Sequence, residues 1–106
     1  MQTIVTARHC EIPESLRERA VSVCERLGQF APRPMDSAVV FDTDGLAHVA
    51  EVRLRASGEV FVAKGDGPDH RTALDRAEEK LRRQLDKRAK RPRAARSRRA
   101  SEATEA

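Results

Sequence analysis

The sequence predicts an α+β fold of two layers, a four-stranded sheet with both helices on one face. Three observations favour it. Four short segments have the β-branched or alternating apolar residues of strands. Two segments have apolar residues at spacings of three and four, as in amphipathic helices. The segments follow in the order β-α-β-β-β-α, and two layers bury one apolar face of each element most economically.

The N-terminal part predicts a strand and then a helix. Gln2–Arg8 is rich in β-branched residues and is the first expected strand. Pro13 suits the first position of a helix, and apolar residues recur at spacings of three and four over Leu16–Leu27. We expect Gly28 to end this helix in a left-handed cap. Cys24 falls on the apolar face, which favours a small buried side chain over a nucleophile or ligand.

Consecutive hairpins are expected to form the rest of the sheet. The remaining strands are predicted at Ser37–Asp42, Leu46–Ala56 and Glu59–Lys64. The middle one alternates from His48 onward, with apolar residues on one face and mostly charged residues on the other. A two-residue turn before the last strand places Leu54 opposite Phe61 and Val52 opposite Ala63. The first crossover is long enough to leave the first strand parallel to a neighbour.

A second, longer helix is expected to follow the sheet. Gly65–Pro68 ends the sheet, and Asp69 is placed to cap a helix over His70–Arg91. We therefore expect one domain over residues 1–91. The remaining residues 92–106 have no apolar side chain larger than Ala, which predicts a disordered tail, basic and then acidic.

This last helix has two stripes of side chains. Its apolar stripe is predicted to face the core and consists of Leu74, Ala77, Leu81 and Leu85. The second stripe, here called the basic stripe, lies roughly 140° away and consists of Arg76, Lys80, Arg83, Lys87 and Lys90. A solvated face with ion pairs, such as Glu79 with Arg83, is the alternative interpretation. Cations at these spacings repel one another, so the stripe favours an anionic partner.

Charge is unevenly distributed along the 106 residues, whose net charge is +4. Residues 1–79 carry 10 Lys/Arg and 14 Asp/Glu, whereas residues 80–100 carry 11 Lys/Arg and a single acid. A strongly basic segment after a mildly acidic body indicates a polyanionic partner, most often nucleic acid.

The sequence contains none of the common motifs of catalytic or cofactor-binding sites. It has no phosphate-binding glycine loop, CxxC, HExxH or nucleophile elbow, so we expect no catalysis, cofactor, metal or small-molecule substrate. Three Phe and no Trp or Tyr argue against a base-stacking platform. We expect no membrane association, since no run approaches the length of a membrane helix and no secretion signal precedes the body. These features favour a cytoplasmic protein.

Two segments of the last helix resemble the ribosome hibernation-promoting factors, a family that includes the ribosome-associated inhibitor A type and proteins once called sigma-factor modulators. Asp69–Asp75 is similar to the family's Asp-x-x-x-Ala-Ile-Asp, and Lys80–Lys87 to its Lys-Leu-x-Arg-Gln-Leu-x-Lys. Further similarities lie in Ala50-Glu51-Val52, in Gly58-x-x-Phe61-x-Ala63 and in the helix Pro13–Leu27. The resemblance covers about residues 2–91.

The resemblance implies a fold similar to double-stranded RNA-binding domains. It also implies binding to the small ribosomal subunit, in the channel for messenger and transfer RNA, which inhibits translation under stress or in stationary phase. The protein is expected to be a monomer off the ribosome. With the basic stripe, the expected contacts to ribosomal RNA are Arg76, Lys80, Arg83, Lys87, Arg88, Lys90 and Arg91, with Arg8, His9, Arg26 and Lys64 as weaker candidates.

Some features depart from the family or leave alternatives open. Ala7 stands where the family has a Gly, and the sequence ends before the second domain of the long members. Whether the protein pairs ribosomes or only silences them therefore stays open. A general double-stranded RNA-binding module and a protein-interaction regulator of a sigma factor are the alternative functions.

Overall fold

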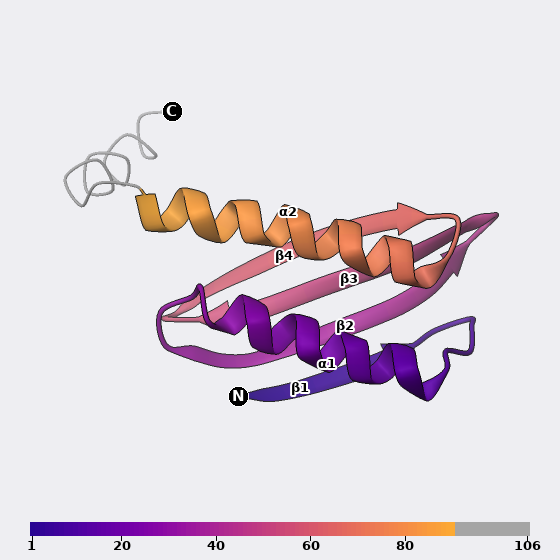
Figure 1. The fold of residues 1–106 in the computed structure, drawn as a ribbon, viewed down its shortest axis with the longest axis horizontal. Helices are drawn as coiled ribbons and strands as arrows, with labels where there is room; N and C mark the ends of the chain where they lie inside the picture. Colours follow the sequence, from indigo (N-terminus) through magenta and orange to yellow (C-terminus); the bar gives the residue numbers. More distant parts are fainter. Residues whose placement is uncertain (91–106) are drawn as a thin grey trace.

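The computed structural model describes residues 1–90, and for Lys90 the backbone alone. Its elements are β1 (Gln2–Ala7), α1 (Glu14–Gly28), β2 (Pro34–Asp44), β3 (Ala47–Ala56), β4 (Glu59–Gly67) and α2 (His70–Lys90). The strands form one sheet in the order β1-β2-β3-β4, with β1 parallel to β2 and the other pairs antiparallel. Both helices lie on one face, α1 over β1 and β2 and α2 along β4 (Figure 1). The predicted two-layer α+β fold is confirmed. Arg91 and the tail expected over 92–106 lie outside the described residues.

The core lies between the helices and the sheet. Every residue of the predicted apolar stripe of α2 is at most 2% exposed, and Phe41, Val52 and Leu54 oppose it from the sheet. Burying one side chain of this size contributes about 1.5–3 kcal/mol. Cys24 is also in the core, as predicted, and burial raises the pKa of its thiol.

The register of the hairpins follows the prediction. Leu54 pairs with Phe61 and Val52 with Ala63. The turn between β3 and β4 is Ser57-Gly58, with φ of 51° and 78°. Positive φ at both positions is the geometry whose twist suits a two-residue hairpin. The alternation within β3 therefore fixes which side chains enter the core.

The predicted ends of the first three strands were partly wrong. β1 ends at Ala7, one residue early, and β2 begins at Pro34 rather than Ser37. An irregularity between Pro34 and Asp36 accommodates the proline, which tolerates the first position of a strand. Asp44 pairs with Ala47, so Leu46 belongs to the turn between β2 and β3 and is fully exposed.

The predicted left-handed cap of α1 was wrong. Gly28 is helical, and Gln29 follows with φ of −69° and ψ of −21°. The N–H of Gln29 donates to the carbonyl of Arg26 at 3.1 Å, so the last turn tightens instead of reversing. Gly28 provides space instead, because a Cβ there would lie 3.1 Å from Cε of Met1.

The predicted end of the sheet at Gly65 was also wrong, since β4 continues to Gly67. A Cβ at Gly65 would lie 2.3 Å from the carbonyl oxygen of Ala73 and 2.7 Å from the backbone nitrogen of Ala77. Glycine at this position thus brings the backbone of α2 against β4, which is a packing role and not a turn.

The predicted start of α2 is confirmed. The N–H of Thr72 donates to Oδ1 of Asp69 at 2.7 Å, the bond of an N-terminal cap. Hydrogen bonds from Thr72 lower the pKa of the Asp69 carboxyl.

Candidate nucleic-acid interface

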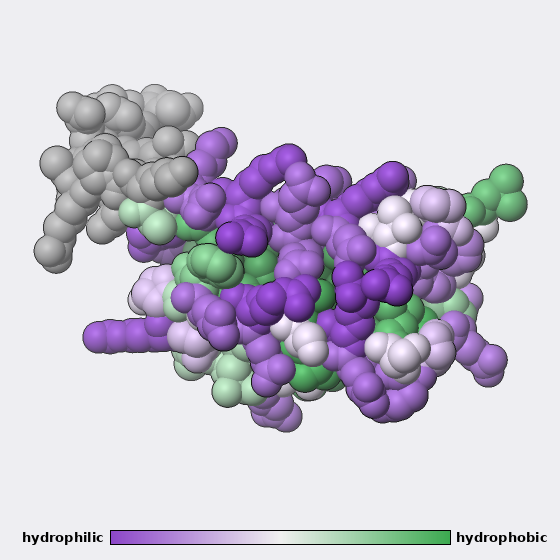
Figure 2. Space-filling view, in the orientation of Figure 1, coloured by the Kyte–Doolittle hydropathy of each residue, from purple (hydrophilic) through white to green (hydrophobic). Residues whose placement is uncertain are grey.

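Long polar side chains cover the outer surface of α2. The side chains of Arg76, Lys80, Arg83 and Lys87 are all exposed. On the face that carries the helices, hydrophilic residues follow α2 along most of its length (Figure 2). The basic stripe is therefore at the surface over the part of it that the structure describes; the side chain of Lys90 is outside that part.

The first two cations of the stripe contact the free edge of β4. Nη1 of Arg76 donates to the carbonyl of Asp66 at 2.8 Å, and Nζ of Lys80 donates to the carbonyl of Lys64 at 2.9 Å. One turn later, Nε2 of Gln84 donates to the carbonyl of Val62 at 2.8 Å. Gln84 is not among the residues predicted from the sequence, although its spacing of four from Lys80 is a usable signal.

Arg88 is bound to a carboxylate. Its Nε lies 2.8 Å and its Nη2 2.7 Å from Oε1 of Glu59, at the start of β4. The hydrogen bond with Glu59 raises the pKa of Arg88. The carboxylate of Glu59 thus balances the charge of Arg88 within the protein. The sequence alone predicts instead a cation that contacts RNA.

Within the described residues neither Arg83 nor Lys87 donates to a carbonyl of β4, although Lys87 lines a hollow of about 270 Å³ with Glu59 and Phe61 of that strand. Nη2 of Arg83 lies 2.5 Å from Oε1 of Glu79, so the ion pair of the alternative interpretation is present. Both members of that pair are well over half exposed, and such pairs contribute little and yield readily to another anion. Within residues 1–89, whose side chains are described, Lys87 has no ion pair.

Arg82 is a further cation of α2, outside the set predicted from the sequence. Its guanidinium lies 4.5 Å from the centre of the Phe30 ring, in a cation–π contact. Phe30 follows α1, so the contact joins segments that are far apart in the sequence. No periodic signal on α2 could have found it.

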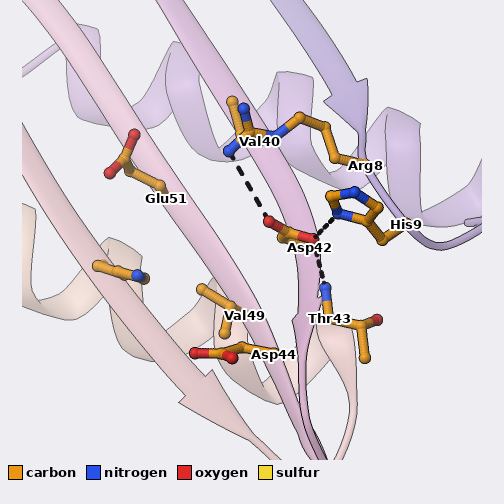
Figure 3. Close-up of a pocket in the computed structure, with 9 residues that line it drawn as sticks. Arg8, His9, Val40, Asp42, Thr43, Asp44, Val49 and Glu51 are labelled. Carbon is orange, nitrogen blue, oxygen red and sulfur yellow. Dashed lines mark hydrogen bonds and ion pairs between the residues drawn. The ribbon is translucent and has the colours of Figure 1, made fainter.

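Three of the weaker candidates meet on the open face, the side of the sheet opposite the helices. A hollow of about 320 Å³ is lined there by Arg8, His9, Val40, Asp42, Thr43, Asp44, Val49, Glu51 and Lys64 (Figure 3). It contains three carboxylates beside its two permanent cations, so the hollow does not attract phosphate strongly.

The carboxylate of Asp42 contacts two of these candidates, Arg8 and His9. Nδ1 of His9 lies 3.0 Å from Oδ1 of Asp42, and Nη2 of Arg8 lies 3.7 Å from Oδ2 (Figure 3). The His9 hydrogen bond, followed by that of the Thr43 N–H, lowers the pKa of the Asp42 carboxyl. Asp42 therefore remains charged and balances the charge of Arg8 beside it.

Arg26, the remaining weak candidate, links the two helices. Its Nε and Nη2 lie 3.1 Å and 3.2 Å from the two carboxylate oxygens of Glu78. Nearby, Nη2 of Arg19 donates to Asp75 at 2.9 Å. Of the eleven predicted residues, the structure describes the side chains of nine and divides them among the β4 edge, the outer face of α2, the open face and the contact between the helices.

The histidines, assigned to separate elements, partly come together. The rings of His48 and His70 are 4.7 Å apart, and Nε2 of His70 donates to the carbonyl of Asp42 at 2.9 Å. Nδ1 of His48 is buried and has no hydrogen-bond partner among the described residues. Over residues 1–90, no group of three or more His, Cys, Asp or Glu is placed to hold a metal. No helix of that part is long and apolar enough to span a membrane.

Comparison with known proteins finds curated relatives. A ribosome hibernation promoting factor of Salmonella typhimurium is 32% identical over 85 residues, which are 80% of this chain and 90% of the relative. A protein of the same name from Escherichia coli is 32% identical over 87 residues, 82% of this chain and 92% of the relative.

Solved structures share the fold. A ribosomal subunit interface protein from Coxiella burnetii aligns with a TM-score of 0.74 at 21% identity, over 84% of this chain and 98% of that one. The N-terminal domain of Thermus thermophilus Protein Y aligns with a TM-score of 0.69 at 22% identity, over 79% and 93%.

One family model spans most of the sequence. It is described as Sigma 54 modulation protein / S30EA ribosomal protein and matches residues 3–93. The resemblance drawn from the segments Asp69–Asp75 and Lys80–Lys87 is thereby confirmed. Together with the curated relatives, this match shows that the chain belongs to the Sigma 54 modulation protein / S30EA ribosomal protein family.

Proposed function

We propose that this protein is a ribosome hibernation factor without catalytic activity. It binds the small ribosomal subunit in the channel for messenger and transfer RNA and so inhibits translation in stressed or stationary cells. The names of the curated relatives, which match over nearly their whole length, support the ribosomal role. The protein acts in the cytoplasm, needs no cofactor and is a monomer before it binds.

The observation that carries the RNA contact is the pair of cations on the outer face of α2. Arg83 and Lys87 are exposed and one helical turn apart, and within the described residues neither donates to the sheet edge as Arg76 and Lys80 do. The helix is 21 residues long, about 31 Å, so its outer face can follow several phosphates.

The aromatic residues favour recognition through phosphates over stacking on bases. Phe41 is fully buried and Phe61 is 9% exposed, and both face the core. Phe30 is 44% exposed, but the guanidinium of Arg82 lies 4.5 Å from the centre of its ring. One partly exposed Phe is not the set of aromatic residues on which unstacked bases stack, so the described residues favour the shape and charge of folded RNA as the recognised features.

The test reverses the outer cations together, in the variant Arg83→Glu/Lys87→Glu. Each phosphate contact contributes about 0.7–0.9 to the slope of the logarithm of the binding constant against the logarithm of salt concentration. We expect the variant to lose sedimentation with small subunits at salt where the wild type binds, and to have a shallower slope. Co-sedimentation over a series of salt concentrations measures both.

The matched control is Arg53→Glu/Arg71→Glu, which makes the same change of charge at exposed positions on β3 and at the start of α2. It should bind nearly as the wild type does. Equal losses in both doubles would show that general charge, and not the outer face of α2, drives binding.

Two further comparisons test the location. Subunits already loaded with messenger and transfer RNA should bind the protein weakly, because the channel is occupied. Plain duplex RNA should compete poorly with subunits. If duplex RNA competes as well as subunits do, the protein is a general double-stranded RNA-binding module instead.

A further inference from the structure

We propose that Arg76, Lys80 and Gln84 are positioning residues that cover the free edge of β4 and hold α2 along it. The ribosomal RNA of the proposed function is then bound by the neighbouring outer row, Arg83 and Lys87. The RNA half of this inference rests on the proposed function. The cover itself is a property of the free protein, so the two parts can fail separately.

The edge of β4 needs such a cover. β4 is the last strand of the sheet, and its residues alternate between backbone groups that pair with β3 and backbone groups that point outward. The carbonyls of Val62, Lys64 and Asp66 point outward, where they accept the three side chains. An uncovered row of this kind is a template for a strand of another chain.

The spacing of helix and strand makes a row of bonds possible. Four residues advance about 6.0 Å along an α-helix. Two residues advance about 6.6–6.8 Å along a strand. From one bond to the next, the donor advances by four residues along α2 and the acceptor moves back by two along β4, so helix and strand run antiparallel. The two advances are nearly equal in length, so each donor meets the next outward carbonyl. One step further, Arg88 continues the row by binding the carboxylate of Glu59.

Gln84 shows what these positions require. It is neutral, yet it makes the same bond to the edge as Lys80 does, at 2.8 Å against 2.9 Å. A donor of sufficient length is therefore what the row needs, and positive charge is not. The cations at 76 and 80 consequently belong with Gln84, although they share the periodicity of the basic stripe.

The first experiment separates the two rows by their salt dependence. The variant Arg76→Gln/Lys80→Gln keeps donors at the edge and removes two charges. The variant Arg83→Gln/Lys87→Gln removes the same charge from the outer row. We expect the salt slope of binding to small subunits to fall by about 1.4–1.8 in the second variant and to change little in the first. Equal falls would overturn the assignment, because Arg76 and Lys80 would then contact phosphate.

The second experiment tests the cover in the free protein. Arg76→Met/Lys80→Met makes the same change of charge as the Gln double but leaves no donors. We expect hydrogen exchange of the β4 amides to rise by about fivefold or more for each bond lost in the Met double. The Gln double should remain near the wild type. Sedimentation velocity should show self-association of the Met double alone.

The outcomes are distinguishable. If the Gln and Met doubles exchange and sediment alike, the donors do not cover the edge and the inference is wrong. If the wild type fails to bind subunits, the proposed function fails while the exchange comparison still decides the cover. Where the Met double does not fold, the single variant Gln84→Met, with no change of charge, provides the same comparison against the wild type.

Discussion

Asp69 illustrates how one side chain fixes where α2 begins. Its carboxylate accepts the N–H of Thr72, one of the groups that a helix leaves unpaired in its first turn. The same bond lowers the pKa of the carboxyl, because a hydrogen bond to the charged form favours that form.

This pKa shift predicts an acid-sensitive contribution to stability. The folded-state pKa of Asp69 is below its unfolded value, so the contribution is complete above the unfolded pKa of about 3.9 and is lost as the pH falls through the folded value. We expect the thermal midpoint of Asp69→Asn to fall less than that of the wild type over this range. Asn caps a helix equally well but has no charge to lose.

Thermal unfolding followed by circular dichroism, from neutral pH down to about pH 2, measures the difference. Asp42 has a lowered pKa as well, so the wild type retains part of its acid sensitivity in either variant. Parallel pH curves for Asp69→Asn and the wild type would contradict the assignment to Asp69.

At the scale of elements, Gly65 fixes the approach of α2 to β4. The backbone atoms of Ala73 and Ala77 occupy the place where a side chain at position 65 would begin. Strand residues normally hold a helix away by the length of their side chains. Here the strand and helix backbones are in contact, which is possible only without a Cβ.

We therefore expect Gly65→Ala to destabilise the protein by about 1–3 kcal/mol, as overpacking does. The free energy of unfolding in urea measures this. The control is Gly28→Ala, whose Cβ would be crowded by the flexible end of Met1 and would meet Pro34 at an ordinary contact distance of 3.6 Å, while the helix would gain propensity. It should change the stability by less than about 1 kcal/mol. If the two substitutions change the free energy of unfolding equally, α2 can shift away from position 65 at little cost, and the close contact there does not limit stability.

The errors in the predicted elements have one physical origin. Glycine tends to end helices and strands when only the local backbone is considered. The sequence alone therefore predicts that Gly28 ends a helix and that Gly65 follows the end of a strand. In the structure each provides room for a segment far away in the sequence, Met1 in one case and α2 in the other. By contrast, the strands and the core face of each helix were predictable, since period two and period 3.6 are local properties.

At the scale of the whole molecule, the fold and the proposed binding depend on different forces. The core is apolar, whereas ion pairs such as Arg26 with Glu78 lie at the surface, where each contributes at most about 1 kcal/mol. Binding to RNA depends on releasing counterions.

One salt series should therefore separate fold from function. Between about 50 and 200 mM salt we expect binding to small subunits to weaken by an order of magnitude or more. The thermal midpoint of the free protein should shift little over the same range, because exposed pairs are already weak. A midpoint that falls in step with binding would mean that salt unfolds the protein rather than detaching it.

The candidate interface was predictable only in part, for a reason that also concerns the whole molecule. Periodicity grouped Arg76 and Lys80 with Arg83 and Lys87, because all of them lie on one side of α2. Which of these cations contact the sheet depends on where β4 lies, and that is a tertiary contact. Likewise, nothing in the sequence around Arg82 indicated that Phe30 lies beneath it.

The glycines of β4 also make the contact between strand and helix unequal along its length. Near the start of α2 the strand presents Gly65 and Gly67, whereas beside Gln84 and Arg88 it presents Phe61. Among these strand residues, the two backbones meet directly only at Gly65. We therefore expect a larger side chain at position 65 to displace the first turns of α2, and so to change the direction of the outer cations without altering any of them.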